Sequence, residues 1–422
     1  MSSGIAEEMP WTKVHTLAFT ALSLGTAVEA YVYSLAYLTV NWFPMPRWLL
    51  VVFSVWPLIW LSIGALVSGP MADALGRKRS LYITWSLYVI GTSLLILSLN
   101  AATLLASLSL LLMAVGGEYN TVLVVAHEIF PRRVRSRSFY LIMNFANLGG
   151  VIASLVTVVA TSPTTQRLAL GLTLAVALIV IFIIRLRIPE SIPWMEGKGL
   201  DATNELTRYF GDYVNRAGTW RGSNPKPSTA RLPVWFRVIV GVVLSYSYVI
   251  GLSSIALTLG PYYFPSMTSW LIMAFSAASF ASGFLGLWAD SLSRRWLLLT
   301  SSALTTALMS TLILTSHYWR GHPWLFWTLY LLTSASMNVY WLSEDALKSE
   351  VWPTLRRGFF TALVRSLAFF LAIPTLALLA YLPLSTYLAL STALFGTSLL
   401  ASAAWFVRGI ETGKGVSVNA PP

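Results

Sequence analysis

The chain has 422 residues, of which 56% are hydrophobic and only 10% are charged, and its net charge is +12. Soluble globular domains carry about 25% charged residues, so this composition excludes a soluble domain and predicts a protein embedded in lipid. Cysteine is absent, which excludes disulfide bonds and thiolate metal sites.

Apolar stretches long enough to cross a bilayer, which takes roughly 20 helical residues, recur along the whole chain. In the first half they lie at 13–40, 48–70, 80–99, 103–126, 138–161 and 166–186. In the second half they lie at 233–260, 268–289, 296–316, 323–346, 358–380 and 384–407. The sequence thus predicts an all-α membrane protein with twelve transmembrane helices, divided into a six-helix bundle at 1–186, a cytoplasmic loop at 187–232, a second six-helix bundle at 233–408 and a cytoplasmic tail at 409–422.

The basic residues are distributed unevenly between the two sides of this predicted topology. If the N-terminus is inside, nearly all of them fall on the cytoplasmic side, Arg185 and Lys348 included, and only Arg47, Arg167 and Arg320 fall outside. This bias is the positive-inside pattern of multi-pass proteins. It predicts a cell-membrane protein with both termini cytoplasmic, and it attributes the positive charge to topology and anionic lipid contact rather than to nucleic acid.

Two sequence landmarks recur in the same order in both halves. "GPMADALGRKR" (69–79) corresponds to "GLWADSLSRRW" (286–296), and "EIFPRRVRS" (128–136) corresponds to "EVWPTLRRG" (350–358). Paired six-helix repeats are typical of secondary transporters, in which the solute site lies between the repeats near the middle of the membrane. The sequence therefore predicts two pseudo-symmetric bundles with a site at their interface.

The loop at 69–79 resembles the signature loop of the major facilitator superfamily. The matching residues are Gly69, Ala72, Asp73, Gly76, Arg77, Lys78 and Arg79, and the second copy keeps Gly286, Ala289, Asp290, Arg294 and Arg295. "EIFPRRVRS" and "IPESIPWMEGKG" (188–199) are similar to the sugar-porter branch, and "AVGGEYN" (114–120) is similar to metabolite and phosphate proton symporters. The resemblance covers essentially the whole chain and implies a secondary active transporter that works by alternating access.

The resemblance also implies a role for the charged residues of these loops. In the superfamily such residues form cytoplasmic charge relays that hold the two halves together while the transporter is open outward. The positions to which this gating role carries over are Asp73, Arg77, Glu128, Arg135, Asp290, Arg294, Glu350 and Arg357. An alternative is that they serve only helix capping and topology.

Differences between this sequence and the motifs of related transporters reduce the number of candidate solutes. The region 245–265, which includes the end of the predicted seventh span, keeps Tyr262 and Tyr263 but lacks the paired glutamines of hexose porters. Phosphate symporters carry a lysine in the eighth span, but the predicted eighth span here has none before Asp290. The predicted fifth span lacks the proline–glycine signature of drug antiporters. The sequence therefore disfavours a hexose, inorganic phosphate and multidrug antiport.

Two acidic residues lie inside predicted spans without a nearby basic residue in the sequence. Glu29 is followed by Tyr31 in the first span, and Glu118 follows two glycines in the fourth. An acid in mid-bilayer costs roughly 2.5–3.5 kcal/mol and is a functional candidate by default. Because burial favours the neutral form of a carboxyl group, we interpret both as proton-coupling residues. The alternative is an acid held at a helix contact.

A second group of charged residues lies nearer the cytoplasmic side of the predicted tenth and eleventh spans. Asp345 and Glu344 precede Pro353 by two to three turns, and Arg365 lies at a similar depth in the next span. An ion pair between Arg365 and one of the acids would offset the desolvation of both. Such a pair is either static or opens to bind an anionic solute.

Further polar residues lie at depths where they could line a cavity. Together with Glu118, Asp345 and Arg365, the predicted solute-binding residues are Tyr31, Asn144, Asn147, Tyr246, Asn338 and Tyr340. Each alone is more often a contact between helices. The four histidines have no metal-binding spacing, and no phosphate-cradling glycine loop is present. The sequence therefore predicts no enzyme, no cofactor and no metal.

These observations favour a monomeric secondary transporter that moves a small polar solute, an organic acid or a sugar-like metabolite, together with protons. Its expected partners are the solute, protons and membrane lipids, with no nucleic acid. One alternative is an uncoupled facilitator or exporter of the same fold. A remote alternative is a membrane sensor that binds a solute without transporting it.

Overall fold

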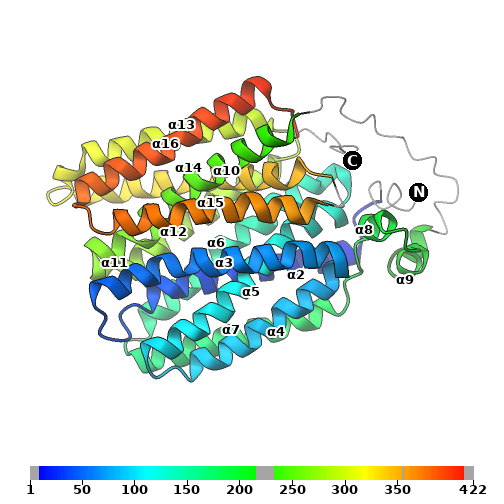
Figure 1. Ribbon diagram of the computed structural model, residues 1–422, viewed down its shortest axis with the longest axis horizontal. Helices are drawn as coiled ribbons and strands as arrows, with labels where there is room; N and C mark the ends of the chain where they lie inside the picture. The colour runs from blue at the N-terminus through cyan, green and yellow to red at the C-terminus, as the bar shows by residue number, and fades with distance from the viewer. Residues whose placement is uncertain (1–8, 215–231, 354–355, 413–422) are drawn as a thin grey trace.

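The protein is built from long, nearly parallel helices. The computed structural model describes residues 9–214, 232–353 and 356–412, and within these ranges all regular secondary structure is helical (Figure 1). This confirms the all-α fold class. Residues 215–231 of the predicted cytoplasmic loop and most of the predicted tail lie outside the described residues.

The first half forms six long helices and two short ones. The long helices are α2 (Lys13–Leu38), α3 (Arg47–Leu75), α4 (Arg77–Ile96), α5 (Ala101–Ile129), α6 (Arg135–Val159) and α7 (Pro163–Arg185). After them come α8 (Ile192–Gly197) and α9 (Thr203–Val214). Each long helix overlaps one predicted span, and the short pair occupies the predicted loop.

The second half repeats the plan with interruptions. Its elements are α10 (Val234–Leu252), α11 (Leu259–Tyr263), α12 (Thr268–Ser282), α13 (Arg294–Leu314), α14 (Pro323–Glu350), α15 (Arg357–Leu379) and α16 (Leu384–Arg408). A π-helical turn at Ser253–Leu257 joins α10 to α11, and a 3-10 segment at Gly283–Trp288 extends α12. Such π segments are frequent at functional sites, and this one borders the cavity described below.

Length and hydropathy identify most of these helices as membrane-crossing segments. Nine segments of the described chain meet both criteria, while α2, α4 and α14 do not. The chain is therefore a multi-pass membrane protein, and the count of twelve spans stays a prediction. In Figure 1 the first half (blue to green) forms the lower layer and the second half (green to red) the upper one.

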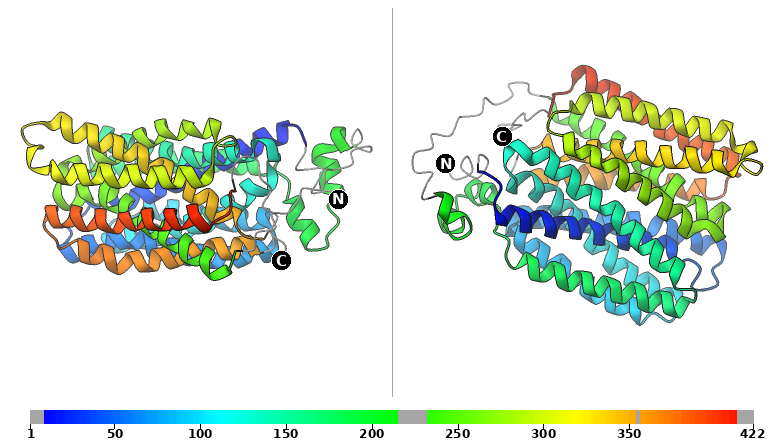
Figure 2. Two further views of the ribbon diagram at one scale, coloured as in Figure 1. Left: turned by 90° about the horizontal axis from the view of Figure 1, so that it is seen from above. Right: turned by 180° about the vertical axis from the view of Figure 1, so that it is seen from behind.

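The two layers meet along equivalent helix pairs. Across the interface α3 packs along α15, and α6 packs along α12. Figures 1 and 2 show α8 and α9 beyond the ends of the long helices, at the end of the bundle where α2 begins and α16 ends. We call this the α8 end. It is the end that the sequence predicts to be cytoplasmic.

Glycines allow α5 to approach its neighbours closely. A Cβ atom on Gly116 would lie 2.2 Å from the carbonyl oxygen of Leu61 in α3, and one on Gly117 would lie 2.8 Å from Cγ2 of Thr84 in α4. At this glycine pair two neighbouring helices therefore approach α5.

We expect Gly116→Ala to lower the free energy of unfolding by about 1–3 kcal/mol, because the carbonyl it meets belongs to a rigid helix and cannot yield. Thermal unfolding of the purified protein in detergent measures this. Gly396→Ala is the matched control, since its Cβ would meet only Thr306 Cγ2 at 3.7 Å. Equal melting temperatures for the two variants would contradict the expectation.

Candidate functional site

A cavity lies between the two halves of the molecule. Its volume is about 130 Å³, which corresponds to about four water molecules at the roughly 30 Å³ that each occupies in the liquid. Its charged lining residues are Glu29, Glu344, Asp345, Lys348 and Arg365, and its aromatic ones are Tyr33, Tyr119, Tyr248, Phe275, Trp341 and Phe369. The pseudo-symmetric halves thus enclose the kind of interface site that the repeat predicts.

Arg365 of α15 is a buried cation that contacts aromatic rings rather than carboxylates. Its guanidinium carbon lies 3.5 Å from the ring centroid of Tyr119 in α5 and 5.4 Å from that of Phe369. The hydroxyl of Tyr119 in turn donates a hydrogen bond to Asp345 in α14. Such a cation–π contact partly offsets the desolvation of a buried guanidinium, and it joins the two halves through Tyr119.

The two acids of α14 pair with a different base from the one that the sequence suggested. Lys348 Nζ lies 2.9 Å from Glu344 Oε1 and 2.6 Å from Asp345 Oδ1. The predicted ion pair between Arg365 and one of these acids is therefore wrong, because Lys348 lies one turn along the same helix and reaches both. Lys348 itself is buried, although the topology had assigned it to the cytoplasmic surface.

Glu29 of α2 faces the cavity with no partner. Its side chain is 2% exposed, and neither carboxylate oxygen has a hydrogen-bond partner among the described residues. A buried charge without a donor is costly, so this environment suits a carboxyl group that carries a proton. Its role in proton coupling remains a prediction.

Glu118 lies apart from the cavity lining and has found its partner on another helix. Its carboxylate accepts hydrogen bonds from Arg185 at the end of α7, and both side chains are buried. Gly25 of α2 makes room for the pair, since a Cβ there would lie 2.6 Å from Glu118 Oε1. Arg185 had been assigned to the cytoplasmic surface. It instead folds back into the first half and supplies the missing counter-charge.

Three asparagines form a bridge between the halves. Asn147 Nδ2 donates to Asn144 Oδ1 at 3.0 Å and to Asn338 Oδ1 at 2.8 Å. Asn338 donates onward to the carbonyl of Ser279 in α12 at 2.7 Å, and Asn144 donates to that of Phe280 at 2.9 Å. Of the three, only Asn147 lines the cavity, so the bridge closes its wall in this conformation.

The three predicted tyrosines contact other helices. Tyr31 donates to the carbonyl of Leu170 at 2.9 Å, and Tyr340 donates to that of Leu244 at 3.0 Å. The hydroxyl of Tyr246 lies 3.0 Å from that of Thr375. None of the three lines the cavity, which matches the alternative of helix contacts.

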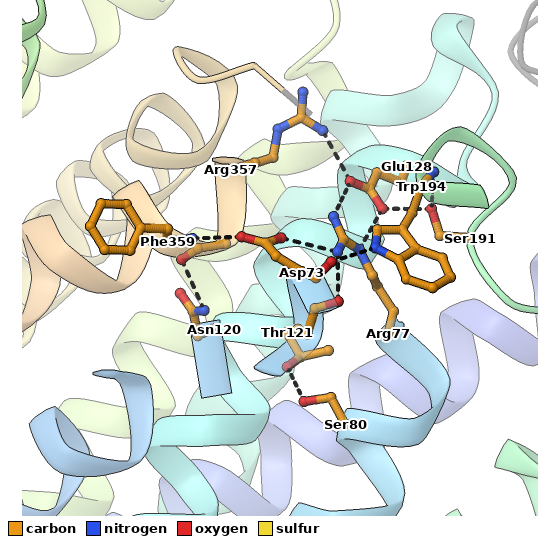
Figure 3. A network of polar contacts seen from close by, with 12 residues as sticks. Asp73, Arg77, Ser80, Asn120, Thr121, Glu128, Ser191, Trp194, Arg357 and Phe359 are labelled. Atoms are coloured by element: carbon orange, nitrogen blue, oxygen red, sulfur yellow. Dashed lines mark hydrogen bonds and ion pairs between the residues drawn. The ribbon is translucent and has the colours of Figure 1, made fainter. Parts of the chain in front are cut away.

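The first loop motif links the halves at the α8 end through a network that we call the first latch, formed by Asp73, Arg77, Glu128 and Arg357 (Figure 3). Arg77 donates to Glu128 through Nε and Nη2, both at 3.0 Å, and to Asp73 at 3.0 Å. Across the interface Arg357 Nη1 lies 3.7 Å from Glu128 Oε1. The backbone N–H of Phe359 donates to Asp73 Oδ2 at 3.1 Å. Asp73 therefore caps the N-terminus of α15, where a negative charge is favoured.

The second loop motif forms the equivalent contacts from the other direction, with an aspartate of the second half at a helix N-terminus of the first half. Asp290 accepts from the backbone N–H groups of Ser136 and Arg137 at the N-terminus of α6, at 3.0 and 3.2 Å. Arg294 donates to Glu350 at 2.9 Å. We call Asp290, Arg294 and Glu350 the second latch.

Burial raises the pKa of the Asp290 carboxyl, and the N–H bonds that it accepts lower the pKa in part. Acid should therefore neutralise this cap at a higher pH than it would neutralise an exposed aspartate.

The central loop also contributes to the first latch. Glu190 accepts from the backbone N–H groups of Arg77 at 2.9 Å and Lys78 at 3.2 Å, and burial raises the pKa of its carboxyl. Ser191 Oγ donates to Glu128 at 2.6 Å. The predicted gating residue Arg135 donates to the carbonyl of Phe130 at 3.3 Å.

We expect Asp73→Ala to favour opening at the α8 end about fivefold, since one helix cap is worth about 1 kcal/mol. The chain has no cysteine, so a single Ser349→Cys, at a buried position beside His127 of the other half, reports opening by its rate of maleimide labelling. Asp201→Ala is the control, because Asp201 is exposed and, among the described residues, accepts a hydrogen bond from its neighbour Thr203 alone. Equal labelling rates for both variants would contradict the role of the cap.

The sequence analysis did not identify the aromatic residues that line the cavity, or Lys348 as the counter-charge of the two acids. Tyr119, Tyr248 and Trp341 line the cavity, and no sequence signal separates them from the many other aromatic residues. Lys348 was recognisable, because it follows Glu344 by four residues, one helical turn. Among the described residues no cluster of histidines and acids is arranged to hold a metal ion.

The family comparison matches the first half of the chain. Residues 24–212 fit the model of the family described as "Sugar (and other) transporter". The niacin transporter NiaP of Acinetobacter baylyi is 27% identical, over 44% of this chain and 46% of that protein. The glucose transporter GlcP of Staphylococcus epidermidis is 31% identical, over 36% of this chain and 34% of its own. The matched region thus spans less than half of each relative.

Solved structures resemble the whole chain. The proton:xylose symporter XylE, a major facilitator superfamily protein, superposes with a TM-score of 0.73 at 16% identity, over 96% of this chain and 97% of its own. The human organic anion transporter MFSD10 superposes with a TM-score of 0.68 at 14% identity, over 95% and 100%. At these identities the likeness shows a shared fold. The proteins found in these comparisons are transporters rather than enzymes.

Proposed function

For a chain that has the major facilitator fold and resembles its sugar porters, we propose a secondary active transporter that moves a small polar solute by alternating access, coupled to protons. The small size of the proposed solute is supported by the cavity, whose volume is about 130 Å³. The α8 end is proposed to be cytoplasmic, as the distribution of basic residues indicates.

The observation that carries proton coupling is the environment of Glu29. It is the cavity-lining acid whose oxygens have no hydrogen-bond partner among the described residues, whereas Glu344 and Asp345 share Lys348. A group that is buried and unpaired in one conformation can release its proton when the cavity opens and water hydrates the carboxylate. That sequence of events couples a proton to the conformational change.

Alternating access is supported by where the contacts between the halves lie. The two latches bind the halves together at the α8 end, beyond the cavity, through charges that exposure to water would weaken. Opening requires both aspartate caps to leave the helix N-termini of the other half. Because the caps are pseudo-symmetric, one rocking motion releases both.

Proteoliposomes loaded with a pH-sensitive dye test this function. On addition of D-xylose, L-phenylalanine or 4-hydroxybenzoate, a coupled transporter acidifies the interior faster than protein-free liposomes do, for the solute that it carries. An imposed inward proton gradient should drive that solute above equilibrium. Solute entry that does not respond to the gradient would support the uncoupled facilitator, and no protein-dependent entry of any solute would contradict transport.

A further inference from the structure

The cavity presents a buried cation that lacks an anion. Among the described residues no carboxylate oxygen lies within ion-pair distance of Arg365, and its Nη1 has no hydrogen-bond partner. Its ring partners Tyr119 and Phe369 cover the guanidinium face but accept none of its in-plane hydrogen bonds. A buried guanidinium with a free edge is a site for a planar anion, above all for a carboxylate.

The other acids near Arg365 are committed elsewhere. Asp345 accepts from Tyr119 and pairs with Lys348. Glu344 pairs with the same lysine and accepts from Ser245. Glu29, which also lines the cavity, has no hydrogen-bond partner among the described residues, an environment that suits its protonated form. Internal groups therefore leave the edge of Arg365 open to a solute.

The remainder of the lining suits an apolar body. Its side chains are mostly aromatic and aliphatic, with the rings of Tyr248 and Trp341 stacked at 5.7 Å and 8°. The amide donor of Asn147 is already used in the bridge between the halves. A sugar needs a partner for each buried hydroxyl, because a buried hydroxyl left without a hydrogen bond weakens binding. Two of the serines in the lining are also engaged, since Ser34 donates to the carbonyl of Ala30 and Ser245 to Glu344.

We propose that the solute is a small monocarboxylate with a flat, apolar body, in keeping with a cavity of about 130 Å³. The carboxylate binds the free edge of Arg365, and the body packs against the aromatic wall of Tyr248 and Trp341. The inference rests on the proposed function in one respect: Glu29 carries the proton that enters with this anion. A zwitterion fits less well, because Glu29, the cavity-lining acid without a partner among the described residues, carries the proton and presents no negative charge to an ammonium group.

Isothermal titration of the purified protein with sodium benzoate and with benzamide tests the charge requirement directly. The two have nearly the same shape, so only the carboxylate charge separates them. We expect benzoate to bind at least about tenfold more tightly, since hydrogen bonds to a charged group contribute about 1.5–3 kcal/mol. D-Xylose and L-phenylalanine should bind more weakly than benzoate. Equal affinity for benzoate and benzamide, tighter binding of either of the other two, or no measurable benzoate binding at millimolar concentration overturns the proposal.

Variants locate the effect. Arg365→Gln should remove most of the preference for benzoate over benzamide, while Arg320→Gln, at an exposed arginine on a loop, should leave it unchanged. Thermal unfolding of each variant confirms its fold, and the ligand pair in the unmodified protein keeps the proposal testable whatever the variants do. Retention of the full preference in a folded Arg365→Gln protein overturns the assignment of Arg365.

Failure of this inference and failure of the proposed function are distinguishable. Proton-coupled uptake of D-xylose with no benzoate binding would reject the monocarboxylate and keep the transporter. Benzoate binding that depends on Arg365, without protein-dependent solute entry into liposomes, would keep the site and reject transport.

Discussion

Replacing Glu118 by glutamine is expected to lower the free energy of unfolding by about 3–5 kcal/mol, because it leaves the charge of Arg185 buried without a counter-charge. The pair lies within the first half, with both side chains no more than 3% exposed. Gly25, which makes room for it, adds no compensating group. Thermal or denaturant unfolding in detergent measures the loss.

The double variant Glu118→Gln/Arg185→Met is the control for this expectation. Removing both charges together removes the uncompensated cation, so much of the lost stability should return. A single Glu118→Gln protein as stable as the unmodified one would instead mean that Glu118 is protonated and that the pair carries no net charge interaction.

Replacing Glu29 by glutamine should abolish accumulation driven by a proton gradient, because the amide has the same shape but cannot exchange a proton. Accumulation should fall to equilibration with the outside, while exchange of solute across the membrane continues. Stability should change by less than about 1 kcal/mol, since Glu29 has no ion pair or hydrogen bond to lose among the described residues. Uptake into proteoliposomes with and without the gradient measures this.

Glu29→Gln and Glu118→Gln therefore make a matched pair. Glu29→Gln is expected to change proton coupling and leave stability nearly unchanged. Glu118→Gln is expected to lower stability, because it removes the counter-charge of Arg185, which lies outside the cavity lining. Asp201→Asn, at an exposed position, should change neither. Gradient-driven accumulation that survives Glu29→Gln would remove this residue from the coupling mechanism and leave the uncoupled facilitator as the better account.

The sequence alone determined the membrane class, the helical fold and the repeated architecture. These follow from local properties: long apolar stretches can satisfy their backbone in lipid only as helices, and the repeated loop motifs are contiguous in the chain. The latches were also predictable as a set, because their residues lie in those motifs. Asp73 and Asp290 are indeed placed where each can cap a helix of the other half.

Only the tertiary structure decided which charge meets which. Glu118 and Arg185 are 67 residues apart in the chain, so no local pattern could pair them. Lys348 pairs with the two acids that the sequence analysis had assigned to Arg365, because Lys348 lies on the same helix as those acids. The freed edge of Arg365 and the unpaired carboxyl of Glu29 are products of packing, and they give the cavity its chemistry. Composition fixes the cost of burying a charge, but only the fold decides which charges are left for a solute and a proton to satisfy.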